Sequence, residues 1–180
     1  MAPKRPVERN GAKKQPRVEP ARLGLPLGHP AALIATWFGA GLLPFMPGTW
    51  GSLAALPFAW AIRFYGGAAA LAISALLAFL VGWWAAARVA AASGKTDPGF
   101  VVIDEVAAQW LVLVVAPLDP RAYAAAFLLF RLFDIAKPRP IDRVERRVGG
   151  GLGIMLDDVV AALYALVILA IGEGALGVRP

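Results

Sequence analysis

The 180-residue chain contains no cysteine and one histidine, His29. The missing cysteine excludes disulfide frameworks, thiol nucleophiles, iron–sulfur clusters and zinc sites built on thiolates. A single histidine excludes any mechanism that needs two, and His29, directly before Pro30, is interpreted as a helix-boundary residue. Charged residues are also scarce, at 17% of the chain against 59% hydrophobic residues. A soluble domain carries about a quarter charged residues, so this composition argues against an ordinary soluble enzyme.

The positive net charge of +6 is concentrated at the N-terminus. Residues 1–22 contain seven basic and two acidic residues, while the rest of the chain is nearly balanced. A basic segment ahead of an apolar domain is typical of contact with anionic lipid head groups and of a cytoplasmic N-terminus. Nucleic-acid-binding proteins usually carry their basic patch on the folded part, so we expect no nucleic-acid partner. We expect residues 1–22 to be a disordered tail and residues 23–177 to form one membrane domain.

Two long runs, 23–62 and 64–87, contain no Asp, Glu, Lys or Arg. The second run has no proline and would form a helix of roughly 36 Å, enough to cross a bilayer core of about 30 Å. The first run is interrupted by several prolines and glycines, which break helices. It is therefore predicted to form a helix over 31–43, a turn over 44–52 and a helix over 53–65. Broken backbone at membrane depth requires cover from protein or water.

Further along the chain the apolar runs become shorter. The runs 106–118 and 122–130 flank a Pro-Leu-Asp-Pro turn and predict a helical hairpin. The run 159–172, extended to about residue 176, predicts a further spanning helix. Together the runs predict an all-α, polytopic membrane helical bundle with short, broken and re-entrant helices.

Nine of the ten acidic residues outside the tail lie between Asp97 and Asp158. Charged residues beside membrane helices are costly and are candidates for function. Each group also has a structural explanation, such as ion pairs within the bundle or a helix N-cap at Asp157. Taken together, the carboxylates exceed the interior bases, and this excess predicts a bound cation. Without histidine or cysteine ligands, carboxylates suit Mg²⁺, Mn²⁺ or Ca²⁺. The predicted metal ligands are Asp104, Glu105, Asp134, Asp157 and Asp158.

The hairpin is expected to bring Asp104 and Glu105 beside Arg131 and Asp134. A cation held by carboxylates next to basic side chains is a site for a phosphate group. The segment 47–52 adds backbone N–H groups and two hydroxyls that can hold an anion, although a plain membrane turn is the alternative. The predicted phosphate-binding residues are Gly48, Thr49, Gly51, Ser52, Arg131 and Lys137. The predicted catalytic residues are Asp104, Glu105, Arg131, Asp134 and Lys137.

Two further segments complete these predictions. The glycines of 149–153 are expected to form a flexible turn that places Asp157 and Asp158 near the start of the next helix. The charged strip over 142–147 is interpreted mainly as a solvated helix face, with contact to anionic head groups as a secondary role.

With these motifs in place, the chain resembles the phosphatidylglycerophosphatase A family, from about Ala35 to Ile171. Five motifs in the same order carry the resemblance: FGAGLLP at 38–44, PGTWGSL at 47–53, VIDEV at 102–106, FRLFDIAKP at 130–138 and GGLGIMLDD at 150–158. The resemblance implies hydrolysis of phosphatidylglycerophosphate to phosphatidylglycerol and phosphate, Mg²⁺ dependence and a bacterial inner-membrane location. The five predicted metal ligands match the family's acidic positions, and Arg131 and Lys137 match its basic ones. We expect the site to face the cytoplasm.

Other functional classes fit this sequence less well. The chain lacks the residues that three classes of phosphatase require: a Cys-x₅-Arg loop, two histidines, or an Asp-x-Asp nucleophile motif. A phosphotransferase of the CDP-alcohol type also uses acidic metal ligands, but its usual acidic spacing is absent. A divalent-cation carrier could use buried carboxylates, yet it gives no reason for Arg131 and Lys137.

Overall fold

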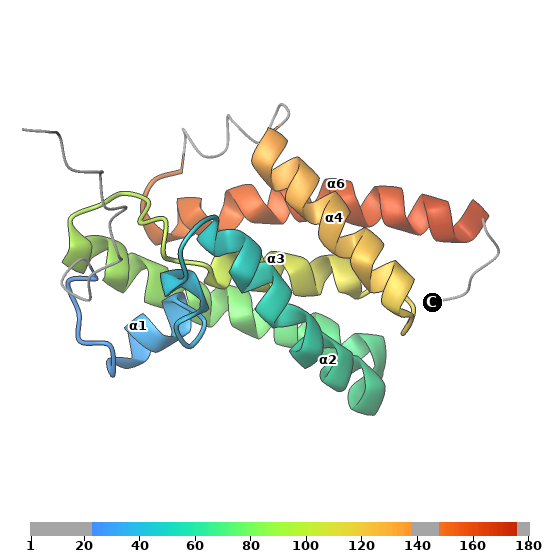
Figure 1. Ribbon diagram of the computed structural model, residues 1–180, viewed down its shortest axis with the longest axis horizontal. Coiled ribbons are helices and arrows are strands. Elements are labelled where there is room, and N and C mark those ends of the chain that lie inside the picture. Colours follow the sequence, from blue (N-terminus) through green and yellow to red (C-terminus); the bar gives the residue numbers. More distant parts are fainter. Residues whose placement is uncertain (1–22, 138–147, 176–180) are drawn as a thin grey trace, which may run out of the picture.

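The computed structural model describes residues 23–137 and 148–175, and each regular element within them is a helix (Figure 1). The all-α class is therefore confirmed for this part of the chain. The tail 1–22 and the strip 142–147 lie outside the described residues. The elements are α1 (Pro30–Ala35), η2 (Ala40–Leu42), α2 (Pro47–Ser93), α3 (Ile103–Leu113), α4 (Pro120–Ala136) and α6 (Gly150–Ala175).

The first helix, α1, is shorter than the predicted helix over 31–43. His29 is its N-cap, as expected, and its Nδ1 accepts a hydrogen bond from a first-turn N–H at 3.1 Å. The helix ends at Ala35, after which the Thr36 hydroxyl donates to the Ala32 carbonyl at 2.7 Å. Trp37 has a positive φ of 47°, a conformation that cannot continue a right-handed helix. Local backbone conformation thus divides the predicted segment into α1 and the short η2.

The second helix, α2, begins at Pro47, so the predicted turn over 44–52 is wrong for residues 47–52. Proline is favoured at the first helical position, where its missing N–H would have no partner in any case. Inside α2, Gly67 has φ 71° and ψ −172°, and the chain doubles back there (Figure 1). We call residues 47–66 the first arm of α2 and residues 68–93 the second arm. The single helix predicted over 64–87 is therefore broken at Gly67.

The helix α3 lies at the centre of the bundle (Figure 1). All of its residues except Glu105 and Leu111 are buried. The Trp110 indole N–H donates to the Ala55 carbonyl of the first arm at 3.0 Å. On another side, Gly82 of the second arm lies so close to Ile103 that a Cβ would come within 2.9 Å of it. Polar side chains carried by α3 are consequently held inside the protein.

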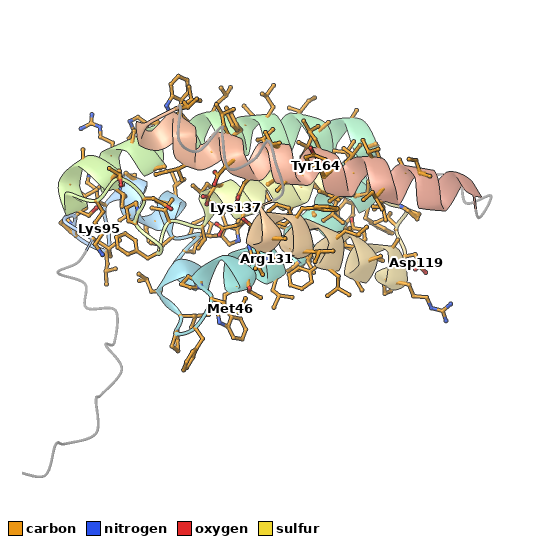
Figure 2. All side chains as sticks on the ribbon, turned by 90° about the horizontal axis from the view of Figure 1, so that it is seen from above. Met46, Lys95, Asp119, Arg131, Lys137 and Tyr164 are labelled. Atoms are coloured by element: carbon orange, nitrogen blue, oxygen red, sulfur yellow. The ribbon has the colours of Figure 1, made fainter. Side chains whose placement is uncertain are left out.

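The helix α4 follows the Pro-Leu-Asp-Pro turn, which confirms the predicted α3–α4 hairpin. Asp119 is its N-cap and accepts hydrogen bonds from two first-turn N–H groups at 2.8 and 3.2 Å. The helix ends at Ala136, because Lys137 has a positive φ of 40° and is followed by a proline. Figure 2 places Asp119 and Lys137 at opposite ends of α4.

The last described helix, α6, begins at Gly150, so most of the predicted flexible turn over 149–153 is helical. Asp157 lies about two turns inside this helix, and the N-cap explanation for it is wrong. Gly151 allows a close approach to the second arm of α2, since a Cβ there would lie 2.7 Å from the Ala87 Cβ. The glycines thus serve packing of α6 against its neighbour.

Both α2 (Pro47–Ser93), which doubles back at Gly67, and the part Gly150–Gly172 of α6 contain a helical stretch long and apolar enough to cross a membrane by length and composition. Large apolar side chains project outward from both. Examples are Leu76, Leu77, Leu80, Val167 and Ile171. Extended exposed apolar surfaces are unusual on soluble monomers and fit contact with lipid.

Candidate active site

Three carboxyl groups meet in the interior of the bundle. Asp104 and Glu105 come from the first turn of α3, and Asp158 comes from α6. One oxygen of each lies within 4.8 Å of the others, so the three side chains could hold a metal ion together. Asp134 of α4 lies close enough to Asp158 for the two carboxyl groups to interact. We call Asp104, Glu105 and Asp158 the carboxylate cluster.

Several oxygens of the carboxylate cluster have no hydrogen-bond partner among the described residues. They are Asp104 Oδ1, Glu105 Oε2 and Asp158 Oδ2. Burial raises the pKa of Asp104 well above its ordinary value, and the nearby Glu105 and Asp158 carboxylates raise that pKa further. Burial also raises the pKa of Glu105, partly offset by its hydrogen bond with Asp104 and by the Arg131 charge. Crowded carboxylates with free oxygens form a strong acceptor set for a hard cation.

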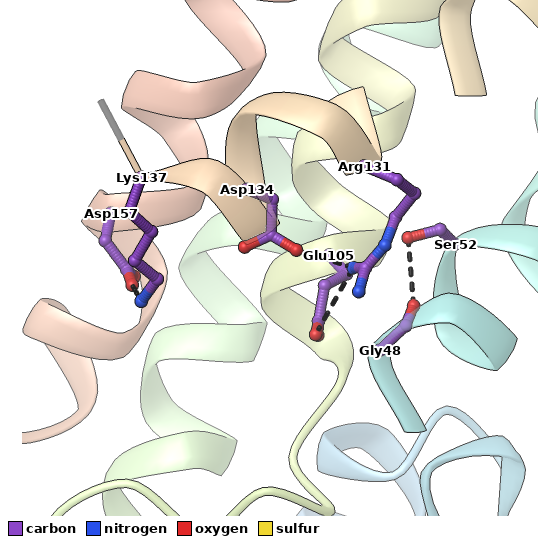
Figure 3. Close-up of polar contacts among 7 residues, drawn as sticks. All are labelled: Gly48, Ser52, Glu105, Arg131, Asp134, Lys137 and Asp157. Atoms are coloured by element: carbon purple, nitrogen blue, oxygen red, sulfur yellow. Dashed lines mark hydrogen bonds and ion pairs between the residues drawn. The ribbon is translucent and has the colours of Figure 1, made fainter. Parts of the chain in front are cut away.

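Arg131 lies beside the carboxylate cluster, as the hairpin predicted (Figure 3). Its Nη1 is 2.7 Å from Asp134 Oδ2 and 3.8 Å from Glu105 Oε1. Its side chain is 11% exposed, and its Nε has no hydrogen-bond partner within the described part of the chain. Asp134 therefore fixes one end of a guanidinium that keeps donors available for another anion.

Residues 131, 134 and 137 are three apart and would share one face if α4 continued through Lys137, but Lys137 points elsewhere. Its left-handed backbone turns it out of α4, and its Nζ lies 2.9 Å from Asp157 Oδ2. Figure 3 shows this pair on one side of Asp134 and the Arg131–Glu105 pair on the other. The two basic side chains thus flank the acidic centre from opposite sides.

The start of α2 closes the site next to Arg131. A Cβ on Gly48 would overlap the Glu105 carboxylate and lie 3.0 Å from Arg131 Nη1. The Thr49 hydroxyl is buried without a hydrogen-bond partner among the described residues. Ser52 donates to the Gly48 carbonyl at 3.0 Å, whereas a Cβ on Gly51 would meet Val102. The structure brings Gly48 to the site and gives Gly51 a packing position on Val102.

A pocket of about 330 Å³ opens next to the cluster. Its polar lining includes Thr96 and Asp97 from the loop before α3, together with Asp104 and Asp157. Neither Thr96 nor Asp97 is among the site residues predicted from the sequence. The sequence signal that could have identified Asp97 is its place at the start of the acid-rich region, seven residues before Asp104.

A match over residues 33–173 identifies the family. The chain belongs to the phosphatidylglycerophosphatase A family. It is 38% identical over 150 residues to phosphatidylglycerophosphatase A of Escherichia coli, covering 83% of this chain and 87% of that protein. It is 39% identical over 142 residues to the protein of the same name from Haemophilus influenzae, covering 78% and 87% of the two chains.

A third relative carries a different name. It is a proposed phosphatidylinositol-3-phosphatase of Bacteroides thetaiotaomicron, 39% identical over 152 residues that cover 81% of this chain and 94% of that protein. No solved structure matches the chain. Membership of the phosphatidylglycerophosphatase A family makes this chain a phosphatase, and the predicted family is confirmed.

Proposed function

We propose that this member of the phosphatidylglycerophosphatase A family hydrolyses the terminal phosphomonoester of phosphatidylglycerophosphate. Water and phosphatidylglycerophosphate are consumed. The bond between the terminal phosphorus and the glycerol oxygen breaks, and phosphatidylglycerol and inorganic phosphate are formed. The observation that carries the proposal is the buried carboxylate cluster with the Arg131 guanidinium 3.8 Å from Glu105. The names of the bacterial relatives support the choice of substrate.

The residues present fit Mg²⁺. Asp104, Glu105 and Asp158 supply oxygens, which Mg²⁺ prefers, and each has a buried oxygen without a hydrogen-bond partner in the described chain. Asp134 and Asp157 stand next to them as further ligands. Bound there, Mg²⁺ would polarise a phosphoryl oxygen and stabilise the charge that develops during transfer.

The chain's own groups bind and orient the phosphate. Arg131 offers guanidinium donors that Asp134 holds in place, and charge-assisted hydrogen bonds to phosphate are strong. The first turn of α2 adds the Gly48 N–H and the buried Thr49 hydroxyl at the positive end of a helix. Lys137 supplies a second positive charge on the far side of Asp134.

We further propose that the protein lies in the bacterial inner membrane, with several spans and with the site at the cytoplasmic surface. The two helices long enough to span, and their outward apolar side chains, support the membrane location. The basic residues of the tail 1–22 support the orientation, because positive segments stay on the cytoplasmic side. The same residues could contact anionic head groups.

Phosphate release from defined lipids tests the proposal. Detergent-purified protein is given phosphatidylglycerophosphate with Mg²⁺, then with excess EDTA, and phosphate is measured. We expect release that requires Mg²⁺ and is lost in Asp134→Asn, while Asp119→Asn, which keeps an N-cap at the remote end of α4, stays active. No release by folded wild-type protein contradicts the proposal.

The same assay separates the other candidate activities. Phosphatidylinositol 3-phosphate is offered in parallel, because one relative's name indicates that lipid. A phosphotransferase of the CDP-alcohol type would need a cytidine nucleotide. A cation carrier would move Mg²⁺ across proteoliposomes and release no phosphate.

A further inference from the structure

An apolar groove of about 490 Å³ lies between the first arm of α2 and α4. Its lining residues are apolar or aromatic and come from one face of each helix. Among them are Leu53, Pro57 and Trp60 on the first arm and Tyr123, Ala124 and Phe127 on α4. No charged side chain of the described residues lines this groove. It therefore suits an uncharged, apolar ligand, and the proposed hydrolysis uses none of its residues.

The groove continues from the end of the site where phosphate is expected to bind. Leu53 lies four residues after Thr49 on the first arm, and Phe127 lies four residues before Arg131 on α4. Residues four apart share a helix face, so the groove begins one turn from the site on both helices. The two helices meet at the site itself, where a Cβ on Gly48 would lie 3.0 Å from Arg131 Nη1. A lipid whose phosphate contacts Arg131 thus has the groove directly beside it.

The length of the groove matches the depth of one membrane leaflet. Trp60, at its far end, lies 12 residues after Gly48. This separation is roughly 18 Å along a helix axis. Half of a bilayer core of about 30 Å is about 15 Å, the depth that an acyl chain of one leaflet fills. A chain that starts at the site can therefore follow the groove to its end.

We propose that this groove holds one acyl chain of the phospholipid substrate while the terminal phosphate lies at Arg131 and the carboxylate cluster. The inference rests on the proposed function, which supplies a substrate with a phosphomonoester and acyl chains. Lipid tails are as apolar as the groove, so the hydrophobic effect does not drive the chain out of the bilayer. Packing against the groove wall instead fixes where the chain leaves the head group. That contact orients the phosphate toward the reacting groups.

Filling the groove separates the acyl chain from the head group. Ala124→Phe adds a ring at an exposed position of the groove wall. Phosphate release by full-length protein in detergent is measured with dipalmitoyl phosphatidylglycerophosphate and with its deacylated head group. We expect kcat/KM for the two-chain lipid to fall at least about tenfold and kcat/KM for the deacylated compound to stay unchanged. An equal loss for both compounds, or no loss for the lipid, overturns the inference.

The matched control is Ala170→Phe, the same change at an exposed position on α6. This variant should alter kcat/KM for neither compound. Equal melting temperatures of the two variants and wild type show that a loss in Ala124→Phe does not come from unfolding.

Photolabelling locates the chain without relying on turnover. Phosphatidylglycerophosphate with a diazirine at the end of one acyl chain is bound to wild type and illuminated, and the labelled peptides are identified by mass spectrometry. We expect label on residues 53–60 and 120–127, lost in Ala124→Phe and kept in Ala170→Phe. Label spread evenly to outward positions such as Leu80 and Val167 overturns the inference. Label in the groove without phosphate release contradicts the proposed function alone, and release with label elsewhere contradicts the groove alone.

Discussion

Gly48 at the start of α2 leaves room for the carboxylate of Glu105 on α3. A Cβ at Gly48 would overlap Glu105 Oε1, so the Glu105 carboxylate can lie in this position only because residue 48 has no side chain. The contact joins the N-terminus of α2 to the carboxylate cluster and to Arg131. A methyl group added at this point tests the site without removing any charged group.

Gly48→Ala should lower activity without lowering stability. The added methyl displaces the Glu105 carboxylate, and we expect kcat to fall at least about tenfold, because small misplacements of reacting groups are costly. Alanine is the better helix former by roughly 0.5–1 kcal/mol, so the melting temperature should not fall. Gly28→Ala, at a position with open space around it, is the matched control. Unchanged kcat in Gly48→Ala would contradict the assigned contact.

Arg131→Lys should reduce turnover despite keeping the positive charge. Lysine cannot reproduce the planar set of donors that Asp134 holds at 2.7 Å. Loss of such donors costs about 10²–10³ in kcat, and we expect a loss of this order. Arg121→Lys, at an exposed position at the start of the same helix, should leave kcat unchanged. Steady-state phosphate release from the three proteins checks this, and equal kcat values would exclude the proposed role.

The Mg²⁺ requirement should become stronger as the pH falls. Burial and neighbouring carboxylates raise the pKa of Asp104, so this group binds a proton at higher pH than an ordinary aspartate. A metal ligand must lose its proton, and proton and metal therefore compete. The Mg²⁺ concentration that gives half-maximal activity should be larger at about pH 6 than at about pH 8. Titrations at several pH values measure it, and a constant concentration would argue against Asp104 as a ligand.

Gly151→Val should destabilise the bundle. A side chain at residue 151 would collide with the Ala87 backbone on the second arm of α2 and push α6 away. Overpacking of this kind costs about 1–3 kcal/mol, which should appear as a lower melting temperature in detergent. Gly172→Val, on the same helix with open space around it, is the control. Equal melting temperatures for the two variants would show that α6 does not pack this closely.

Much of the fold and of the site could be predicted from the sequence. The turn between two short apolar runs was enough to predict the hairpin, because a tight turn forces its flanking helices to run back along each other. That places Glu105 near Arg131, as the 3.8 Å contact shows. The chemical types of the site residues are likewise sequence properties, and they led to the phosphatase family.

The errors in the predicted elements have a local cause. Pro47 and Gly48 favour both a turn and the first turn of a helix, so their residue types do not separate the two structures. Gly67 breaks the apolar run 64–87, which looks continuous in the sequence. Glycine can adopt a left-handed φ, and the sequence does not mark the glycines that do so. The same ambiguity made the glycines of 149–153 look like a flexible turn.

The sequence by itself determined that this protein is helical, apolar and rich in carboxylates near two basic side chains. Only the tertiary structure decided which of these groups meet. The periodicity of α3 shows which residues share a face, but the burial of Asp104 depends on α2, α4 and α6 packing around that helix. Lys137 would share a face with Arg131 if α4 continued through it, yet a left-handed backbone turns it to Asp157. Contacts between helices distant in sequence set the position of each charge, and no local pattern encodes them.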